Sequence, residues 1–451
     1  MTRLRGCLGF GLGLLTTVIA TAASAAPAAA PALLGHQVPL ELDGAGTAWL
    51  STSTALVLLM TLPGLALFYG GMVRRKNVIA TITQSVGVFA VATLVWFIAG
   101  YSIAFGKAGA LGGYSADTVN QFIGSFDAFF LNGVGMETAH SLLPGIPEFV
   151  FLSFQMTFAI ITPALVTGAF AERLKYTGLL LFTALWSLLV YAPIAHWVWG
   201  GGFLGGAGVL DFAGGAVVHV NSGVAGLVCA IFLGARKGYG KESIVAHNPV
   251  LTMIGASLLL VGWIGFNAGS AGGANALAGV ALINTILAAA AASVTWKIVE
   301  VIEKKKASLI GVLSGIVAGL VAITPAAGFV DPKGAVLIGL IAGPVCYASS
   351  VWIKKLLRYD DSLDAFGIHG AGGLLGALLT GVFASTAINS LSEGANVMTQ
   401  LIGLGWTIAY SAVGTLIILI ICKFTTGLRV SAEAEEEGLD THLHGEALES
   451  V

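Results

Sequence analysis

Eleven apolar stretches of 19 to 29 residues follow one another along this chain of 451 residues. A helix rises about 1.5 Å per residue, so roughly 20 apolar residues cross a bilayer core about 30 Å thick. Charged residues make up only 10% of the chain, whereas soluble domains carry about 25%. These features predict an all-α membrane protein with eleven transmembrane helices. The stretches cover residues 47–71, 77–105, 148–170, 177–198, 213–235, 250–268, 276–301, 308–328, 334–353, 365–386 and 398–422.

The first residues have the pattern of a secretory signal peptide. Arg3 and Arg5 supply a positive start, an apolar core follows, and Ala-Ser-Ala at 23–25 fits a cleavage site. We therefore predict a signal peptide over 1–26 and an exported N-terminal arm over 27–46. An uncleaved first membrane helix is the less favoured alternative.

The distribution of basic residues predicts the orientation in the membrane. Sixteen Lys and Arg residues fall in alternate loops and in the C-terminal tail, whereas the opposite side has only Lys107 and Lys333. Loops rich in Lys and Arg stay in the cytoplasm. The mature N-terminus is therefore expected outside and the C-terminus inside, which an odd number of helices requires.

Two polar segments lie outside the membrane stretches. Residues 106–147 form the longest outer segment and are interpreted as an ordinary solvated cap. Residues 423–451 form a cytoplasmic tail with four glutamates between 433 and 437. Its composition favours a disordered, solubilising tail over a docking or regulatory segment.

The overall composition excludes several classes of protein. A net charge of −2 argues against nucleic acid as a partner. The four cysteines, Cys7, Cys229, Cys346 and Cys422, suggest neither a disulfide framework nor a metal site, and no cofactor is expected. Glycine accounts for 62 residues, roughly double the usual share of about 7%, which predicts close packing of helices.

The first ten stretches divide into two sets of five that run in opposite directions. The repeats cover about 47–235 and 250–386, and 398–422 forms a last helix. Inverted repeats are typical of transport proteins, whose substrate sites lie at the repeat interface near the bilayer midplane.

Each repeat ends on a stretch with an aspartate followed by a histidine: Asp211 and His219 in the first, Asp364 and His369 in the second. A titratable residue in a membrane helix is costly and usually faces a cavity or a partner. We therefore favour a shared functional site over two separate core histidines. N-capping is the main role expected of both aspartates. If both mark the membrane surface, the histidines miss each other by about 10 Å.

Aromatic residues with helical spacing recur in three of the stretches: Phe154 and Phe158, Trp199, and Trp263 and Phe266. Such stripes usually pack in a core or face lipid. They also form cages in which ring faces replace part of the water shell of a cation. The spacing does not distinguish these uses.

Several long motifs, in order, resemble ammonium transporters of the Amt/MEP/Rh family, and most closely the bacterial Amt branch. The matching segments are LPGLALFYGGMVRRKN (62–77), GAFAERLKY (168–176), PIAHWVWGGGFL (193–204), DFAGGAVVHVNSGVAGLV (211–228), GWIGFNAGSAG (262–272), DAFGIHGAGGLLG (364–376), GLRV (427–430) and EGLD (437–440). The resemblance covers nearly all of the mature chain.

The resemblance implies a transporter, not an enzyme, that conducts ammonium or ammonia across the plasma membrane (the bacterial inner membrane). It further implies a homotrimer of eleven-helix subunits and a PII-type signalling protein as a possible cytoplasmic partner. The roles that it assigns are an ammonium-binding site of Phe154, Phe158, Trp199 and Ser270, a gate of Phe158 and Phe266, a conducting pair of His219 and His369, a buried carboxylate at Asp211 that is required below the site for deprotonation or for structure, and a pore-lining Trp263.

Three alternatives remain open at this point. The first is a related transporter for methylammonium, another organic cation or carbon dioxide. The second is a sensor that uses the pore as a receptor. The third is an intramembrane haem protein with His219 and His369 as axial ligands.

Overall fold

The computed structural model describes residues 33–111 and 113–448, and the predicted signal peptide over 1–26 lies outside them. The described residues contain ten helices that are long and apolar enough to cross a membrane. These helices cover Gly44–Met72, Arg75–Phe105, Glu148–Phe170, Tyr176–Gly206, Gly215–Leu233, Pro249–Gly269, Ala276–Lys304, Pro332–Leu357, Phe366–Phe383 and Val397–Thr425.

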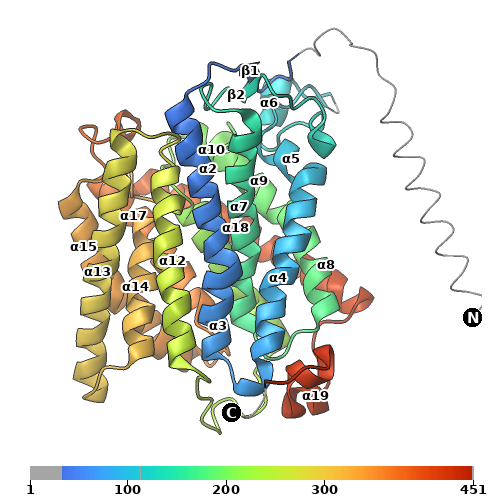
Figure 1. The fold of residues 1–451 in the computed structure, drawn as a ribbon, viewed down its shortest axis with the longest axis vertical. Helices are drawn as coiled ribbons and strands as arrows, with labels where there is room; N and C mark the ends of the chain where they lie inside the picture. The colour runs from blue at the N-terminus through green and yellow to red at the C-terminus, as the bar shows by residue number, and fades with distance from the viewer. Residues whose placement is uncertain (1–32, 112, 449–451) are drawn as a thin grey trace, which may run out of the picture.

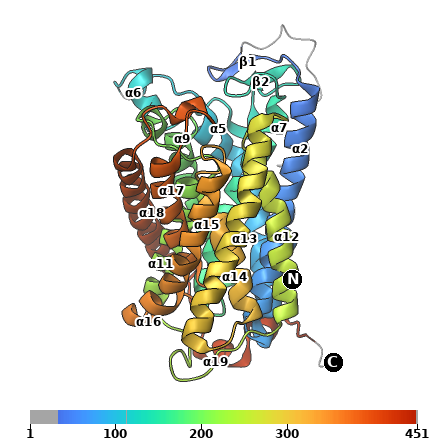
Figure 2. The same cartoon turned by 90° about the vertical axis from the view of Figure 1, so that its left-hand side faces the viewer.

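The long helices run side by side along the long axis of the molecule (Figures 1 and 2). A two-stranded sheet lies at one end of the bundle and α19 at the other (Figure 1). The strands are β1 (Gln37–Pro39) and β2 (Thr138–His140). The α-helices are α2 (Gly44–Leu59), α3 (Ala66–Met72), α4 (Val78–Val95), α5 (Tyr101–Phe105), α6 (Ala116–Asn120), α7 (Glu148–Phe170), α8 (Tyr176–Trp186), α9 (Ala192–Val198), α10 (Phe203–Gly206), α11 (Asn221–Leu233), α12 (Pro249–Gly269), α13 (Ala276–Lys304), α14 (Leu309–Ile323), α15 (Pro332–Tyr347), α16 (Lys354–Leu357), α17 (Ala371–Phe383), α18 (Val397–Thr425) and α19 (Ala432–Glu437).

Each predicted apolar stretch overlaps one helical segment of the structure, which confirms a helical membrane protein. The stretch at 308–328 corresponds to α14, which is apolar but has only 15 residues. The chain continues from α14 through fully buried turns up to residue 330. This is why ten long helices, and not eleven, satisfy the length criterion in the described residues.

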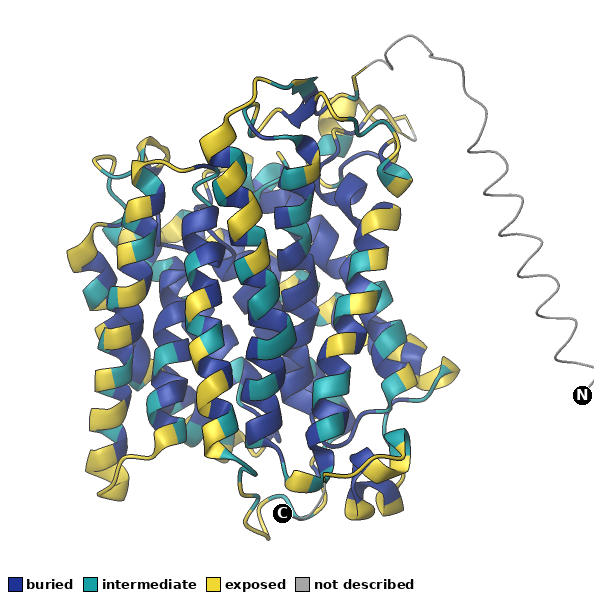
Figure 3. Cartoon of the chain, viewed as in Figure 1, coloured by how far each residue is buried: buried dark blue, intermediate teal, exposed yellow. Residues whose placement is uncertain are grey.

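Glycines bring the helices close together, as the composition predicts. A side chain at Gly319 of α14 would place its Cβ 2.3 Å from the carbonyl oxygen of Ala288 in α13. At Gly339 of α15 the same oxygen would be 2.4 Å away. Both helices therefore approach the backbone of α13 at positions where no Cβ fits. Buried residues fill the interior between the helices, and exposed ones mark the rim (Figure 3).

Many of the helices contain a turn of π-helix, in which hydrogen bonds span one residue more than in an α-helix. Such turns are rare in proteins, and those that do occur are frequently found at functional sites. In the described residues they cover Met60–Leu65, Trp96–Gly100, Ser187–Tyr191, Gly215–Val220, Ala348–Ile353, Phe366–Gly370 and Asp440–His444. His219 and His369 each lie in one of these turns.

The predicted outer segment at 106–147 is not merely a solvated cap. Its strand β2 pairs antiparallel with β1 of the N-terminal arm. His140 is buried, and its Nε2 lies 3.0 Å from the carbonyl oxygen of Phe105. From the arm, His36 contacts the buried carboxylate of Glu148 at 3.0 Å. Polar contacts of this kind fix the arm and the outer segment against the helices.

The C-terminal tail is ordered over its described residues, so the disorder expected from its composition is wrong. Arg429 donates to the carbonyl oxygen of Leu233 at 2.7 Å. Asp440 is buried and accepts a hydrogen bond from the backbone N–H of Ala80 at 2.8 Å, at the start of α4. An acidic composition does not reveal these contacts because each depends on a backbone group of a distant helix end.

A buried ion network joins the two repeats at the end of the bundle that carries α19. Arg236 contacts Asp360 at 2.8 Å and Glu172 at 3.1 Å. Burial alone raises the pKa of Asp360, but hydrogen bonds and charge from Arg236 outweigh it and hold the pKa below its usual value. The pKa of Glu172 is likewise lowered, because the charges of Arg236 and Arg74 outweigh its burial.

Candidate functional site

An aspartate organises the backbone before each histidine. The buried carboxylate of Asp211 accepts four backbone N–H groups, at distances of 2.6 to 3.0 Å. These donors belong to residues 214–217, which open the π-helical turn. Gly214 has φ +111°, a conformation that favours glycine, and this allows the chain to turn back over the carboxylate. The predicted capping role of Asp211 is therefore observed.

In the second repeat the capping residue is Asp361, and the prediction of Asp364 is wrong. Asp361 accepts the N–H groups of Ala365 at 3.0 Å and Phe366 at 2.7 Å. Asp364 has φ +59°, and its carboxylate forms an ion pair with Lys354 instead. A left-handed residue next to the helix start directs its side chain away from the first N–H groups. The N–H groups that bond Asp361 lie four and five residues after it. A usual N-cap side chain bonds the N–H two or three residues after it, so the sequence pattern did not indicate Asp361.

The two histidines are in contact at the interface between the repeats. Nδ1 of His219 lies 3.3 Å from Nδ1 of His369, and both rings are buried. The ring planes are inclined by only 22°, with centroids 5.3 Å apart. A haem group does not fit between two ring nitrogens at this distance, which disfavours the haem alternative.

A hydrogen bond between two Nδ1 atoms requires one of them to carry the proton. A neutral imidazole has one N–H and one bare nitrogen. The ring that donates through Nδ1 therefore has a bare Nε2, and its partner carries a proton on Nε2. The pair thus presents one acceptor and one donor. Nε2 of His219 is buried without a hydrogen-bond partner among the described residues.

Two stacked rings separate the histidines from the outer surface. Phe158 of α7 and Phe266 of α12 stack with centroids 4.2 Å apart and planes inclined by 29°. This is the distance of direct ring contact, so no molecule fits between them. Both side chains are buried.

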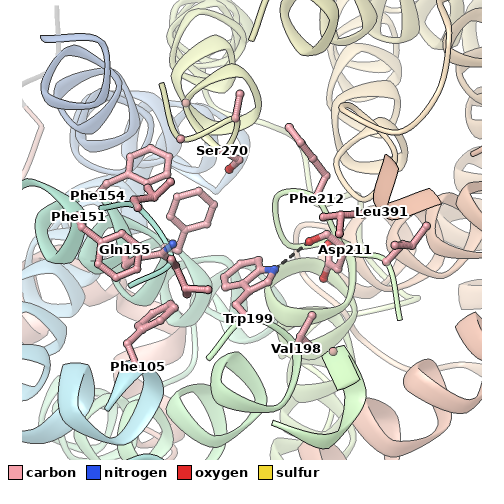
Figure 4. A pocket seen from close by; sticks show the side chains of 18 of the residues that line it. Phe105, Phe151, Phe154, Gln155, Val198, Trp199, Asp211, Phe212, Ser270 and Leu391 are labelled. Atoms are coloured by element: carbon pink, nitrogen blue, oxygen red, sulfur yellow. Dashed lines mark hydrogen bonds between the residues drawn. The ribbon is translucent and has the colours of Figure 1, made fainter. Parts of the chain in front are cut away.

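A cavity of about 420 Å³ lies on the outer side of these rings (Figure 4). The predicted binding residues Phe154, Phe158, Trp199 and Ser270 all line it, as does Asp211. Trp199 stands edge-on to Phe158, with centroids 5.7 Å apart. Its indole N–H donates to the carbonyl oxygen of Asp211 at 2.8 Å, which fixes its orientation. Ser270 donates its hydroxyl proton to the carbonyl oxygen of Phe266, so its lone pairs are free to accept.

On the inner side of the rings a much smaller void continues the path. It measures about 10 Å³ and is lined by both histidines, Trp263 and Phe266 among other residues. A void of this size holds at most one water molecule. Trp263 stacks on His219 at a centroid distance of 5.3 Å, and its N–H donates to Thr324 at 2.8 Å. The arrangement is therefore a roomy outer cavity, a closed ring pair and a narrow segment past the histidines.

The sequence analysis missed one polar residue of the outer cavity. Gln155 follows Phe154 on α7 and lines the cavity (Figure 4). No periodic pattern singles it out, because a lone glutamine on an apolar helix carries no motif. The described residues contain no cluster of three or more His, Cys, Asp or Glu side chains able to hold a metal ion.

Comparisons with known proteins agree with this geometry. A model of the Ammonium Transporter Family matches residues 48–448. The chain is 47% identical over 411 residues to the ammonium transporter of Aquifex aeolicus, covering 90% of this chain and 93% of that protein. It is 46% identical over 398 residues to the ammonium transporter of Bacillus subtilis, covering 87% and 95%.

Solved structures share the fold. The crystal structure of Saccharomyces cerevisiae Mep2 superposes with a TM-score of 0.78 at 35% identity, covering 87% of this chain and 89% of that one. A structure described as a sensor Amt protein superposes with a TM-score of 0.79 at 31% identity, covering 89% and 98%.

Proposed function

The chain belongs to the ammonium transporter family, a family of membrane transporters and not of enzymes, and from this premise we propose how it conducts its substrate. Ammonium enters the outer cavity, gives a proton to the solvent that reaches this cavity, and passes the stacked rings and the histidine pair as ammonia. The observation that carries this proposal is the order of the parts: cavity, closed Phe158–Phe266 pair, then the His219–His369 contact.

The outer cavity suits a small nitrogen cation. An unpaired ion is very costly in an apolar medium. The faces of Phe154, Phe158 and Trp199 offset part of this cost through cation–π attraction, and Ser270 offers a hydrogen-bond acceptor. Potassium has a similar size but no N–H group, so the acceptor favours ammonium.

Past the rings, the narrow apolar segment disfavours any cation, so the proton leaves before the nitrogen passes. The carboxylate of Asp211 holds the turn that carries His219, and the backbone carbonyl oxygen of Asp211 fixes Trp199. The histidine pair then offers ammonia one acceptor and one donor, and a pair that shares a proton can also relay one.

The decisive experiment is ammonium-induced current in proteoliposomes, measured with and without a pH gradient. We expect ammonium-dependent uptake in the wild type and competition by methylammonium. Uptake of carbon dioxide or another organic cation without any response to ammonium would overturn the proposal. The names of the curated relatives favour transport over the sensor alternative.

For the membrane topology, we propose eleven spans with α14 as the short eighth, in the bacterial inner membrane. The N-terminus then lies outside after removal of the signal peptide 1–26, and the C-terminus inside. The support is the count of sixteen basic residues against two and the positions of β1 and α19 at opposite ends (Figure 1). A phosphatase fused after residue 451 is expected to be inactive; an active fusion would reverse the orientation.

For the assembly, we propose a homotrimer whose cytoplasmic face binds a PII-type signalling protein, as the family resemblance implies. The apolar outer faces of α13 and α15 are available for subunit contacts, with exposed Ile283, Ile286, Leu337 and Ile341. The mass of the purified protein in detergent tests the trimer. A pull-down that fails to retain the host's PII protein at low 2-oxoglutarate would remove that partner.

A further inference from the structure

Gln155 is the one side-chain amide in the lining of the outer cavity, among the described residues. Its side chain makes no hydrogen bond with any described residue, and its Oε1 is buried without a donor. A polar group in an apolar wall costs free energy unless it binds something. We propose that Gln155 is a specificity-determining residue whose amide oxygen accepts a hydrogen bond from the ammonium ion. The inference rests on the proposed function.

The cavity has few other side-chain acceptors to offer. Both carboxylate oxygens of Asp211 are already occupied by four backbone N–H groups. The indole of Trp199 is a donor and is bonded. Among the side chains just described, only Ser270 is left to accept. Ammonium carries four N–H donors, so one hydroxyl leaves most of them without a side-chain partner.

The protein does not fix which way the amide of Gln155 faces. The oxygen and the NH₂ group are nearly identical in shape, and hydrogen-bond partners normally decide their orientation. Here neither position has a protein partner. A half-turn about the last side-chain bond therefore exchanges the two groups without breaking a contact. A cation in the cavity selects the orientation that turns the oxygen toward it.

The position on the helix supports this role. Gln155 lies next to Phe154, and three residues before Phe158, on α7. Phe154 and Phe158 contact each other edge-to-face, with centroids 5.0 Å apart. Figure 4 shows Gln155, Trp199 and Ser270 around the same cavity. The amide thus adds a directed acceptor to a site whose walls otherwise attract the cation mainly through ring faces.

The test uses four proteins in proteoliposomes: the wild type, Gln155→Leu, Gln155→Glu and Gln84→Leu. Ammonium uptake is measured over a range of ammonium concentrations, which separates the half-saturating concentration from the maximal rate of uptake. Gln84 is the matched control, because its Oε1 is also buried without a partner but it lies on α4 and does not line the outer cavity.

We expect Gln155→Leu to raise the half-saturating concentration about tenfold, the effect of losing one hydrogen bond to a charged group. The maximal rate of uptake stays within about twofold because the path past the rings is unchanged. Gln155→Glu keeps an acceptor, so its half-saturating concentration stays at or below that of the wild type. Gln84→Leu behaves as the wild type.

An unchanged half-saturating concentration in Gln155→Leu would overturn the inference, as would an equal rise in Gln84→Leu. If Gln155→Leu does not reach the membrane, Gln155→Glu decides: a half-saturating concentration well above that of the wild type contradicts an acceptor role. A wild type that takes up no ammonium would instead refute the proposed function, so the two failures are distinguishable.

Discussion

The two repeats place a histidine in the same local structure but support it differently. Asp211 anchors four N–H groups of its π-helical turn and faces the outer cavity. Asp361 anchors two and lies beside the Asp364–Lys354 ion pair. Both repeats thus hold the histidine turn with a buried aspartate, but the first has more hydrogen bonds and the second has more charged groups nearby.

The largest expected effect comes from removing the two anchors. Asp211→Ala leaves four buried N–H groups unpaired and Asp361→Ala leaves two. Since an unsatisfied buried group costs about 1–3 kcal/mol and relaxation recovers part of it, we expect losses of about 4 and about 2 kcal/mol. Chemical unfolding in detergent measures both. Equal losses, or a larger loss for Asp361→Ala, would contradict the comparison.

The next effect concerns the histidines themselves. His219→Ala or His369→Ala removes half of the donor–acceptor pair, and we expect either change to alter flux or ion selectivity about tenfold without unfolding the protein. Ammonium and potassium currents in proteoliposomes provide the measurement. If both variants retain wild-type rate and selectivity, the histidine contact has no part in conduction.

A smaller effect, the pH dependence of the stability, distinguishes the two repeats. Burial and then the charge of Asp364 raise the pKa of Asp361 from 3.8 to about 6. The folded protein therefore holds this proton more tightly than the unfolded chain, and the resulting stability is lost as the pH rises from about 4 to about 6. We expect Asp361→Asn to remove this loss of stability, so that the melting temperature falls less between about pH 4 and about pH 6 than it does in the wild type. An unchanged slope in this window would contradict the assignment, and Asp117→Asn in the exposed outer segment serves as control.

The smallest effect is expected at the ion pair that only the second repeat has. Lys354→Met separates the partly exposed Lys354–Asp364 pair, and such pairs contribute at most about 1 kcal/mol. The same unfolding assay detects the change. A loss as large as that of Asp361→Ala would show that the pair, and not the anchor, holds the inner turn.

The lengths of the apolar stretches predicted most of the helices, because a membrane helix must match the thickness of the bilayer core. The histidines were identifiable because a titratable residue in an apolar helix is costly. Asp361, the anchor of the second repeat, could not be identified from the sequence. Asp364 is closer to His369 than Asp361 is, but its left-handed backbone turns it toward Lys354. The contacts of the C-terminal tail and the position of Gln155 in the cavity wall could not be predicted either, because both depend on the tertiary structure.

The stacked rings of Phe158 and Phe266 have an electrical consequence. Water conducts well enough that little of a membrane potential falls across the outer cavity, so most of it falls across the short, closed segment beyond. A charge crossing there gains about 2.3 kcal/mol per 100 mV, and a neutral molecule gains nothing. The voltage dependence of uptake therefore reports whether charge crosses at this one point.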